Sequence, residues 1–396
     1  MAEPAGPLRV LSVAHTAVSR AAGRLRYHQL ADDASLDVHL VVPARWHQFG
    51  RWYEADPGSD PGVTLHTLPI RLPKAGPASW YLHHYPDLAA LADRLQPDVI
   101  HLWEEPWSVV ALQAGRVARR HGAALAMEVN QNILTRLPLP FELIRRRVLR
   151  RTDLVMSRSD DATGVVRACG YTGPATALGY GVDQAIFHPG GRAAAAGAVE
   201  LGYVGRVVEE KGLDDVLEAM ALASAAIRLT IVGEGPHLSA LQARVARLGL
   251  GERVRFLPWA DPAQVGAFLR GLHALVLPTR LTPAVKEQFG RVIIEAQACG
   301  TPVIGADTGA IPSVVGAGGW IVPERDPAAL ASLLTRLSNE PGEIAARGLD
   351  GLANVEARFT YAAVAKDLAD GWRLAAAQRA GRAAPAEPRR LRFSRA

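Results

Sequence analysis

Short apolar segments alternate with amphipathic stretches along the first half of the chain. Apolar runs occupy residues 8–14 and 38–43, and further runs follow at residues 63–68 and 97–102. Short runs with few charges are typical of parallel strands that helices cover on both faces. The Ala/Leu-rich residues 87–95 predict one of these helices. This alternation predicts an α/β domain built on a doubly wound sheet.

A second series of apolar runs begins at residues 200–205 and continues at 227–233, with a predicted helix over 213–223 between them. The later runs of this series are residues 254–257, 274–278, 302–305 and 319–323. Residues 190–197 (GGRAAAAG) are small and lack hydrophobic periodicity, which favours a linker between two domains. The chain is therefore predicted to contain two α/β domains.

The domain boundaries follow from these two series. We expect a first domain over residues 1–190, a second over 198–360, and a ligand cleft between them. A further helix is predicted over residues 361–378. Residues 379–396 are rich in arginine with little apolar content, which predicts a mobile basic tail.

Composition narrows the class of protein. With 396 residues, of which 49% are hydrophobic, each domain can bury a core of its own. No run of about 18 uncharged apolar residues occurs, and the N-terminus lacks the pattern of a secretory signal, so we expect a cytoplasmic protein. The two cysteines, Cys169 and Cys299, offer neither a disulfide framework nor metal-ligand spacing. A net charge of +5 is a weak signal for nucleic acid, so no nucleic-acid partner is expected.

The first chemical signal is the segment EQFGRVIIE, residues 287–295. Its pattern predicts a helix from near Gly290 to Gly300, which leaves Glu287 in the preceding loop and Glu295 within the helix. Free backbone N–H groups at the helix start favour an anion between the two carboxylates. A nucleotide diphosphate fits this arrangement, although spacing alone equally allows a surface carboxylate and a helix salt bridge.

The second signal is GRVVEEKG, residues 205–212, which follows a predicted strand and leads into a helix. Here Arg206 and Lys211 can converge on phosphate oxygens, the first as a planar fork and the second as a point charge. A solvated connection between a strand and a helix is the alternative.

In their order and context these segments resemble the retaining glycosyltransferase family 4, also called glycosyl transferases group 1. The resemblance also rests on VGEGP at residues 232–236 and on ACGTPVI at residues 298–304, and it is close over residues 199–330. It implies the GT-B fold, an α/β architecture in which two Rossmann-like domains face an interdomain cleft. It also implies that the helix after residue 360 crosses back onto the first domain.

The same resemblance implies roles for residues of the second domain. It assigns the diphosphate to Arg206 and Lys211, with Gly205 opening their turn, and the ribose hydroxyls to Glu295. Glu287 and the amides near Phe289 and Gly290 would hold the donor sugar. The residues expected near the nucleobase are Val232, Gly233, Glu234 and Leu257 to Trp259.

The first domain matches the family more loosely. Many members carry a histidine soon after the strand that matches residues 99–102, but this chain reads HLWEEPW there, with Trp103 or Glu104 at that position. We expect Glu104 or Glu105 to stabilise charge at the anomeric carbon or to accept a hydrogen bond from a hydroxyl group. The alternative is that one of the pair caps the next helix.

Several other polar residues are candidates for the acceptor side. His15 and Thr16 follow the first strand, in place of the family's glycine-rich loop. The remaining candidates are Arg24 and Arg26 in a helix predicted over residues 23–32, and Asn130 and Asn132 after the apolar run 123–129. The basic run 144–151 (IRRRVLRR) permits peripheral contact with an anionic membrane, although a solvated helix packed on its own sheet is the favoured interpretation.

These observations predict a retaining glycosyltransferase that moves a sugar from a nucleotide diphosphate, expected to be a UDP-sugar, to an acceptor hydroxyl. The acceptor is either a small specialised metabolite or an envelope glycan or lipid precursor. No metal or other cofactor is expected, since the chain has no Asp-x-Asp triplet. The alternatives are an epimerase of the same architecture and a non-catalytic protein that binds nucleotide sugars; the missing G-x-G-x-x-G argues against a dehydrogenase.

Overall fold

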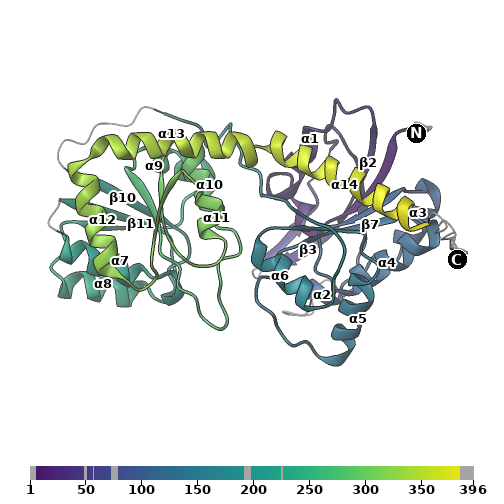
Figure 1. The fold of residues 1–396 in the computed structure, drawn as a ribbon, viewed down its shortest axis with the longest axis horizontal. Coiled ribbons are helices and arrows are strands. Elements are labelled where there is room, and N and C mark those ends of the chain that lie inside the picture. Colours follow the sequence, from purple (N-terminus) through teal and green to yellow (C-terminus); the bar gives the residue numbers. More distant parts are fainter. Residues whose placement is uncertain are drawn as a thin grey trace, which may run out of the picture.

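The computed structural model of the protein describes residues 6–48, 51–56, 58–72, 79–190, 198–223 and 226–383. Two α/β lobes lie side by side, each built around a parallel sheet (Figure 1). Residues 191–197 of the predicted linker and residues 384–396 of the predicted tail lie outside the described residues, whereas residues 379–383 of that tail belong to the last helix and correct the predicted boundary. The prediction of two doubly wound α/β units is confirmed.

The N-terminal lobe contains a seven-stranded sheet of order β5-β2-β1-β6-β7-β8-β9, in which every pairing is parallel. The strands are β1 (Leu8–Val13), β2 (Leu36–Pro43), β5 (Thr64–Leu68), β6 (Val99–Leu102), β7 (Ala124–Val129), β8 (Leu154–Ser157) and β9 (Ala175–Ala177). The larger helices are α3 (Leu88–Leu95), α4 (Val109–His121), α5 (Leu139–Leu149) and α6 (Asp160–Ala168). A short antiparallel pair, β3 (Arg45–Gln48) and β4 (Arg51–Glu54), and the helix α2 (Ser79–Leu82) complete the lobe.

The C-terminal lobe contains a six-stranded parallel sheet of order β12-β11-β10-β13-β14-β15. Its strands are β10 (Val199–Val204), β11 (Ile227–Val232), β12 (Val254–Leu257), β13 (Ala274–Leu277), β14 (Val303–Ala306) and β15 (Gly319–Val322). Its helices are α7 (Leu213–Leu222), α8 (Leu238–Arg247), α9 (Pro262–Arg270), α10 (Arg291–Ala298), α11 (Ile311–Val315), α12 (Pro327–Asn339) and α13 (Pro341–Arg358). Both sheets have a central strand where the order reverses, and ligands bind at such points in open α/β sheets.

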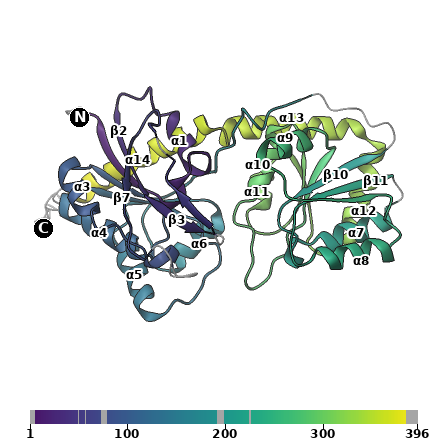
Figure 2. The ribbon, with the colours of Figure 1, turned by 180° about the vertical axis from the view of Figure 1, so that it is seen from behind.

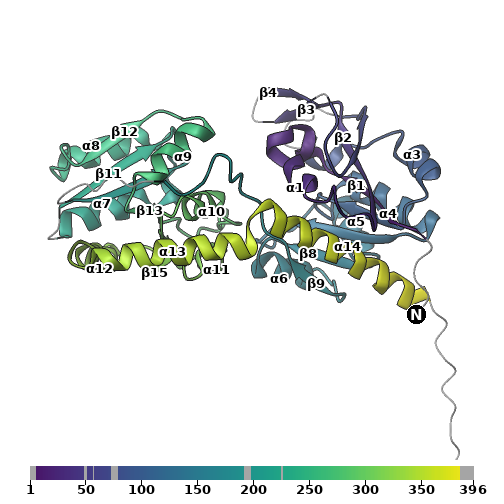
Figure 3. The same ribbon diagram turned by 90° about the horizontal axis from the view of Figure 1, so that it is seen from above.

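The last helix, α14 (Tyr361–Ala383), leaves the C-terminal lobe and packs on the N-terminal one (Figures 2 and 3). Trp372 on α14 is fully buried, and its ring stacks on that of Tyr27 at a centroid distance of 6.4 Å. Val364 and Leu368 join the same core. The chain therefore crosses between the lobes a second time, and burial of this apolar face stabilises the crossing.

The helix expected over residues 23–32 is much shorter than predicted. A single wide turn over residues 20–24 leads into α1 (Leu25–His28), and the chain then turns away. Gly23 packs so closely on Ala17 that a Cβ atom there would lie 2.8 Å from the Ala17 Cα. Local packing thus replaces a regular helix in this segment.

Among the described residues no helix is both long and apolar enough to cross a bilayer.

Candidate active site

The carboxyl ends of the two sheets face each other, and side chains from both lobes meet there. In the loop after β7, Asn132 Nδ2 donates hydrogen bonds to the backbone oxygens of Lys286 at 3.2 Å and Glu287 at 3.0 Å. The Lys286 ammonium pairs with Asp161 of α6 at 2.6 Å. These contacts connect the N-terminal lobe directly to the loop that precedes α10.

A cavity of about 410 Å³ lies between the lobes. Its lining includes Ala21 from the N-terminal lobe, Trp259, Arg291 and Glu295 from the C-terminal lobe, and Tyr361 from the start of α14. Most of the lining is apolar, with charged groups from α10 at one side. A cavity of this kind suits a nucleoside-sized ligand with a few polar anchors.

Backbone geometry shapes the turn after β10. The chain at Gly233 approaches Gly205 so closely that a Cβ atom on Gly233 would lie 1.9 Å from the Gly205 oxygen. The Tyr203 hydroxyl donates a hydrogen bond to the Arg206 backbone oxygen at 2.7 Å, which stabilises the turn. The Arg206 side chain is exposed and has no hydrogen-bond or ion-pair partner within the described part of the chain. Its guanidinium is therefore available to an anion.

Lys211 lies in a short turn, residues 209–211, and its side chain points toward Glu287 in the segment 287–295. Its Nζ donates to Glu287 Oε2 at 2.5 Å and lies 3.4 Å from Thr279 Oγ1, which in turn lies 3.3 Å from the same carboxylate. The following Gly212 has φ +67° and sits against the Pro278 oxygen, where a side chain would clash. The structure thus brings together Lys211 and Glu287, which are far apart in sequence.

The start of α10 offers backbone donors without a side-chain cap. Gly290 at the N-cap has φ 78° and no side chain accepts from the first turn. Phe289 is buried against Tyr180 and Phe359, so only its backbone can reach a ligand. Free N–H groups at a helix N-terminus favour an anion.

Glu295, on the first turns of α10, faces the interlobe cavity. No hydrogen bond or ion pair to its carboxylate occurs among the described residues. Burial raises the pKa of this carboxyl, and the nearby Arg291 acts in the opposite direction. A largely buried carboxylate without a partner lacks compensation for desolvation, so hydroxyl donors from a ligand would satisfy it.

The residues expected near a nucleobase lie at the ends of β11 and β12. Trp259 is 64% exposed and lines the cavity, and Leu257 is partly exposed. The Gly233 N–H donates to the Leu257 oxygen at 3.0 Å, while Glu234 points outward with its backbone oxygen engaged by Val207.

Glu104, one of the two carboxylates expected to meet the sugar or an acceptor hydroxyl, is buried within the N-terminal lobe. Its side chain is 1% exposed, and its Oε1 lies 2.5 Å from His15 Nδ1 and 3.5 Å from His83 Nε2. Burial alone would raise the pKa of this carboxyl, but the two histidines outweigh burial and lower it to about 2. The side chain with access to solvent is that of His15, which is 12% exposed.

Glu105 also lacks the predicted access, because it is used within the N-terminal lobe. Its Oε1 accepts the backbone N–H groups of Asn130 at 2.9 Å and Gln131 at 3.0 Å. Burial raises the pKa of this carboxyl to about 7, although both hydrogen bonds lower it. Glu105 therefore fixes the loop that carries Asn132.

Arg24 is excluded as a contact for acceptor or diphosphate, since its side chain is fully buried and pairs with Asp60 at 2.9 Å. Arg26 is nearly buried, pairs with Glu128 at 2.6 Å and lies 3.8 Å above the Trp103 ring. It nevertheless borders a small cavity beside Arg291. The Trp103 ring thus packs against the Arg26 cation.

Two of the other acceptor-side candidates, Asn130 and Asn132, form hydrogen bonds within the protein. Asn130 Oδ1 accepts from the Tyr180 hydroxyl at 3.1 Å and from Arg158 Nε at 3.3 Å. The Thr16 hydroxyl is buried without a hydrogen-bond partner in the described structure. The Asn132 side-chain N–H binds backbone oxygens of the C-terminal lobe, as described above.

Sequence reasoning missed two further groups at this end of the sheet. Glu128 lies near the carboxyl end of the otherwise apolar strand β7 and pairs with both Arg26 and Arg158. His83 belongs to a segment without a recognisable motif. A charged residue within an otherwise apolar strand was the one signal that could have pointed to Glu128.

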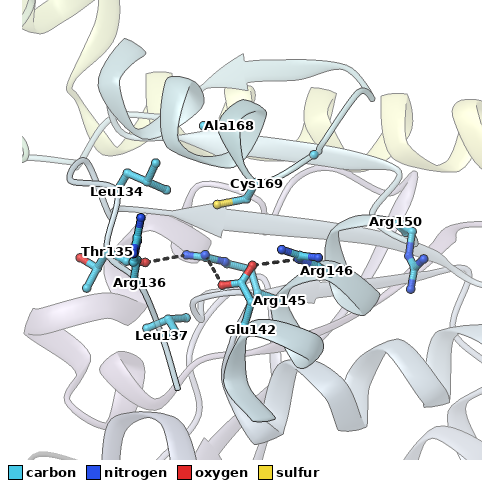
Figure 4. A pocket seen from close by; sticks show the side chains of 11 residues that line it. Leu134, Thr135, Arg136, Leu137, Glu142, Arg145, Arg146, Arg150, Ala168 and Cys169 are labelled. Atoms are coloured by element: carbon cyan, nitrogen blue, oxygen red, sulfur yellow. Dashed lines mark hydrogen bonds and ion pairs between the residues drawn. The ribbon is translucent and has the colours of Figure 1, made fainter. Parts of the chain in front are cut away.

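A second cavity, of about 690 Å³, lies on the N-terminal lobe along α5 (Figure 4). Figure 4 shows the Glu142 carboxylate accepting hydrogen bonds from Arg145 and Arg146, with Cys169 on the opposite wall of the cavity. Arg136 and Arg150 line the same cavity. This basic surface is separate from the interlobe cavity, with which it shares no lining residue.

Comparison with known proteins supports the sequence-based resemblance. Residues 192–348 match the model of the family described as glycosyl transferases group 1. The D-inositol 3-phosphate glycosyltransferase of Segniliparus rotundus is 38% identical over 225 residues, which are 52% of this chain and 47% of that protein. The protein of the same name from Streptomyces bingchenggensis is 34% identical over 55% of this chain and 51% of its own length. The chain thus matches these relatives over about half of their length.

Solved structures share the fold over nearly the whole chain. A sucrose-phosphate synthase from Thermosynechococcus elongatus is 21% identical, with a TM-score of 0.65 over 92% of this chain and 98% of that structure. HepE of Anabaena, solved in complex with UDP, is 16% identical, with a TM-score of 0.66 and the same two coverages. The predicted GT-B fold and the resemblance to group 1 glycosyltransferases are confirmed.

Proposed function

We propose that this protein is a retaining glycosyltransferase that transfers a sugar from a nucleotide diphosphate, most suitably UDP, to an acceptor hydroxyl. The observation that carries the proposal is the unpartnered Glu295 carboxylate, which lines the interlobe cavity at the helix that the Lys211–Glu287 pair precedes. The exposed Arg206, after β10 of the same lobe, adds a free guanidinium. The names of the relatives, and UDP in the complex of HepE, point the same way.

Each charged group has a distinct task in this account. Arg206, Lys211 and the N–H groups at the start of α10 neutralise the diphosphate as it leaves. Glu295 accepts hydrogen bonds from the ribose hydroxyls, and Glu287 both orients Lys211 and accepts from a sugar hydroxyl. The donor is thereby held in one orientation against the N-terminal lobe.

Transfer proceeds on one face of the sugar. The bond from the anomeric carbon to the phosphate oxygen breaks, the acceptor oxygen bonds to that carbon from the same side, and the acceptor proton passes to the departing phosphate. Positive charge on the sugar is balanced by the phosphate itself. We propose that departure of the diphosphate does not use a metal, because Arg206, Lys211 and the N–H groups at the start of α10 supply the positive charge.

The acceptor that we propose is a small polyhydroxylated molecule, and the relatives' name makes an inositol phosphate the first to test. The Arg291 side chain is exposed and lines the interlobe cavity, so it suits a phosphate on that acceptor. An envelope glycan or lipid precursor is the second class of acceptor.

We further propose that the protein works in the cytoplasm and touches an anionic membrane through α5. Ile144, Val148 and Leu149 of the predicted basic run face the lobe's interior, so the exposed apolar groups lie one turn earlier than expected. Leu139 and Leu143, four residues apart, are 71% and 57% exposed, and Arg146 follows them on the same face. Leucine beside arginine suits the interface of a bilayer.

The test is transfer by the purified protein from UDP-, GDP- and ADP-sugars to a panel of polyols and inositol phosphates, with the product's anomeric configuration read by NMR. The account predicts an α-linked product from an α-linked donor. A β-linked product would contradict retention, interconversion of donors without an acceptor would favour the epimerase, and binding without turnover would favour a non-catalytic protein.

A further inference from the structure

Three side chains in the N-terminal lobe form a cluster that the donor site does not use. His15 follows β1, Glu104 follows β6, and His83 follows α2. Among the described residues, only this group places three ligand atoms, His15 Nδ1, His83 Nε2 and a Glu104 oxygen, within 4.8 Å of one another. We propose that this cluster binds a divalent transition-metal ion of the zinc class.

Charge supports the proposal. The Glu104 carboxylate is almost completely buried, and its partners in the described part of the chain are the two histidines and the His15 backbone N–H at 3.3 Å, with no arginine or lysine. A buried carboxylate needs a compensating positive charge. A divalent cation would supply that charge and would bind neutral imidazole nitrogens at the same time.

The distances are close to those of a metal site. Ligand atoms around a tetrahedral zinc ion are about 3.3 Å apart, since zinc–nitrogen and zinc–oxygen bonds are about 2.0–2.2 Å long. His83 Nε2 lies 3.5 Å from Glu104 Oε1, and His15 Nδ1 lies 2.5 Å from the same atom. A rotation that moves His15 Nδ1 by about 1 Å would admit the ion.

The surroundings hold both rings in place. The fully buried Trp46 on β3 lies 4.4 Å from the His15 ring and 4.9 Å from the His83 ring, measured between centroids. The hydroxyl of Tyr85 is buried without a hydrogen-bond partner in the described structure, and the Tyr85 ring lies 5.9 Å from the His83 ring, measured between centroids. Such outer groups orient the ligands of metal sites.

The ligand set indicates the kind of metal. Two imidazoles and one carboxylate, with a fourth position free, are the ligands of catalytic zinc sites. Magnesium and calcium prefer oxygen ligands and are not expected here.

The exposure of the three ligands indicates where the fourth coordination position of the ion lies. His15 is the only one of the three side chains with appreciable exposure, at 12%, so the fourth position opens on its side. β1 and β6 end at the same edge of the sheet as β7, whose following loop binds the C-terminal lobe through Asn132. If the proposed function holds, an ion there would lie on the acceptor side and bind an acceptor oxygen.

The experiment measures metal binding without any nucleotide, so it is independent of the proposed function. Chelator-treated wild-type protein is titrated with Zn²⁺ by calorimetry, and bound metal is counted by mass spectrometry after dialysis. We expect one equivalent, and at least a tenfold weaker affinity in His83→Ala and in Glu104→Gln. The matched control is His66→Ala, which breaks the His39–His66 pair on the same lobe and should leave binding unchanged.

Because either variant in the cluster can perturb folding, Co²⁺ bound to the wild-type protein provides a second measurement. Intense visible absorption bands of a tetrahedral Co²⁺ site, displaced by one equivalent of Zn²⁺, are expected. The proposal is overturned if the wild-type protein binds no Zn²⁺, if folded His83→Ala and Glu104→Gln bind it as well as wild type, or if His66→Ala abolishes binding.

Discussion

The Asn132 side-chain amide donates a hydrogen bond to the Glu287 backbone oxygen at 3.0 Å, joining the loop after β7 to the loop before α10. The Glu287 carboxylate, in the same residue, holds Lys211. A residue of the N-terminal lobe therefore positions the lysine–glutamate pair that we assign to the donor, and the two lobes form one site.

Replacing Asn132 with alanine should reduce kcat/KM about fivefold, because the loss of such a hydrogen bond is worth roughly 1 kcal/mol and loosens the donor loop. UDP affinity should change less than about threefold, since Asn132 does not touch the nucleotide in this account. The matched control is Gln131→Ala, whose side chain bonds only within its own loop. Steady-state kinetics and calorimetry of both variants check this, and equal losses in the two would contradict it.

Replacing Arg206 with alanine should weaken UDP binding by roughly 10- to 100-fold, the range expected for a charge-assisted contact with phosphate. Uridine should bind both proteins alike, because it lacks the diphosphate. Arg228→Ala is the control, since Arg228 lies at the opposite end of β11 and pairs with Glu200. An unchanged UDP affinity in Arg206→Ala would remove this residue from the site.

Glu295→Gln should weaken UDP binding about fivefold near pH 8 by replacing a charged acceptor of ribose hydroxyls with a neutral one. Since burial raises the pKa of the Glu295 carboxyl, wild-type affinity should improve as pH rises and the carboxylate forms. The variant should lack this dependence on pH. Deoxyribose analogues of UDP should bind the two proteins equally, and a preserved preference of the variant for UDP would refute the assignment.

The raised pKa of Glu105 predicts that the free energy of unfolding depends on pH. Its pKa is raised from 4.5 to about 7 in the folded protein, so its stabilising contribution is complete below 4.5 and is lost as pH rises to about 7. Glu105→Gln removes this loss, and its Tm relative to wild type should increase from about pH 5 to about pH 7 and then stay constant. Glu104 does not interfere, because its pKa of about 2 places its effect at lower pH. Thermal melts measure both proteins across this range, and a difference in Tm that stays constant from pH 5 to pH 7 would contradict the interpretation.

Leu139→Ser combined with Leu143→Ser should reduce binding to anionic phospholipid vesicles by about tenfold, since two exposed apolar side chains no longer enter the interface. Binding to vesicles of neutral lipid should be weak for wild type and variant alike. Leu349→Ser, at an exposed leucine of α13 in the other lobe, is the control. Cosedimentation measures all three, and a variant that binds like wild type would exclude α5 as the contact.

The alternation of apolar runs was enough to predict both sheets, because strands buried on both faces leave a continuous apolar signal. The start of α10 after Gly290 was predictable for a similar reason, as its glycine and apolar spacing are local. Lys211 and Glu287 could be nominated from their motifs, but their contact depends on how two distant loops fold together.

The N-terminal lobe was predicted less well because its polar residues are used in tertiary contacts that sequence spacing does not encode. Glu104 meets His83, and Arg24 meets Asp60, across long intervals of the chain. A carboxylate or arginine after a strand gives the same sequence signal whether it faces a ligand or a buried partner. Only the fold distinguishes the two.

The most direct test of the central claim is a calorimetric titration of the chelator-treated protein with UDP, GDP and ADP. The account predicts one-site, metal-free binding of a nucleoside diphosphate, strongest for UDP and weakened in Arg206→Ala. Absence of binding by all three nucleotides would contradict the assignment of the interlobe cavity as a donor site.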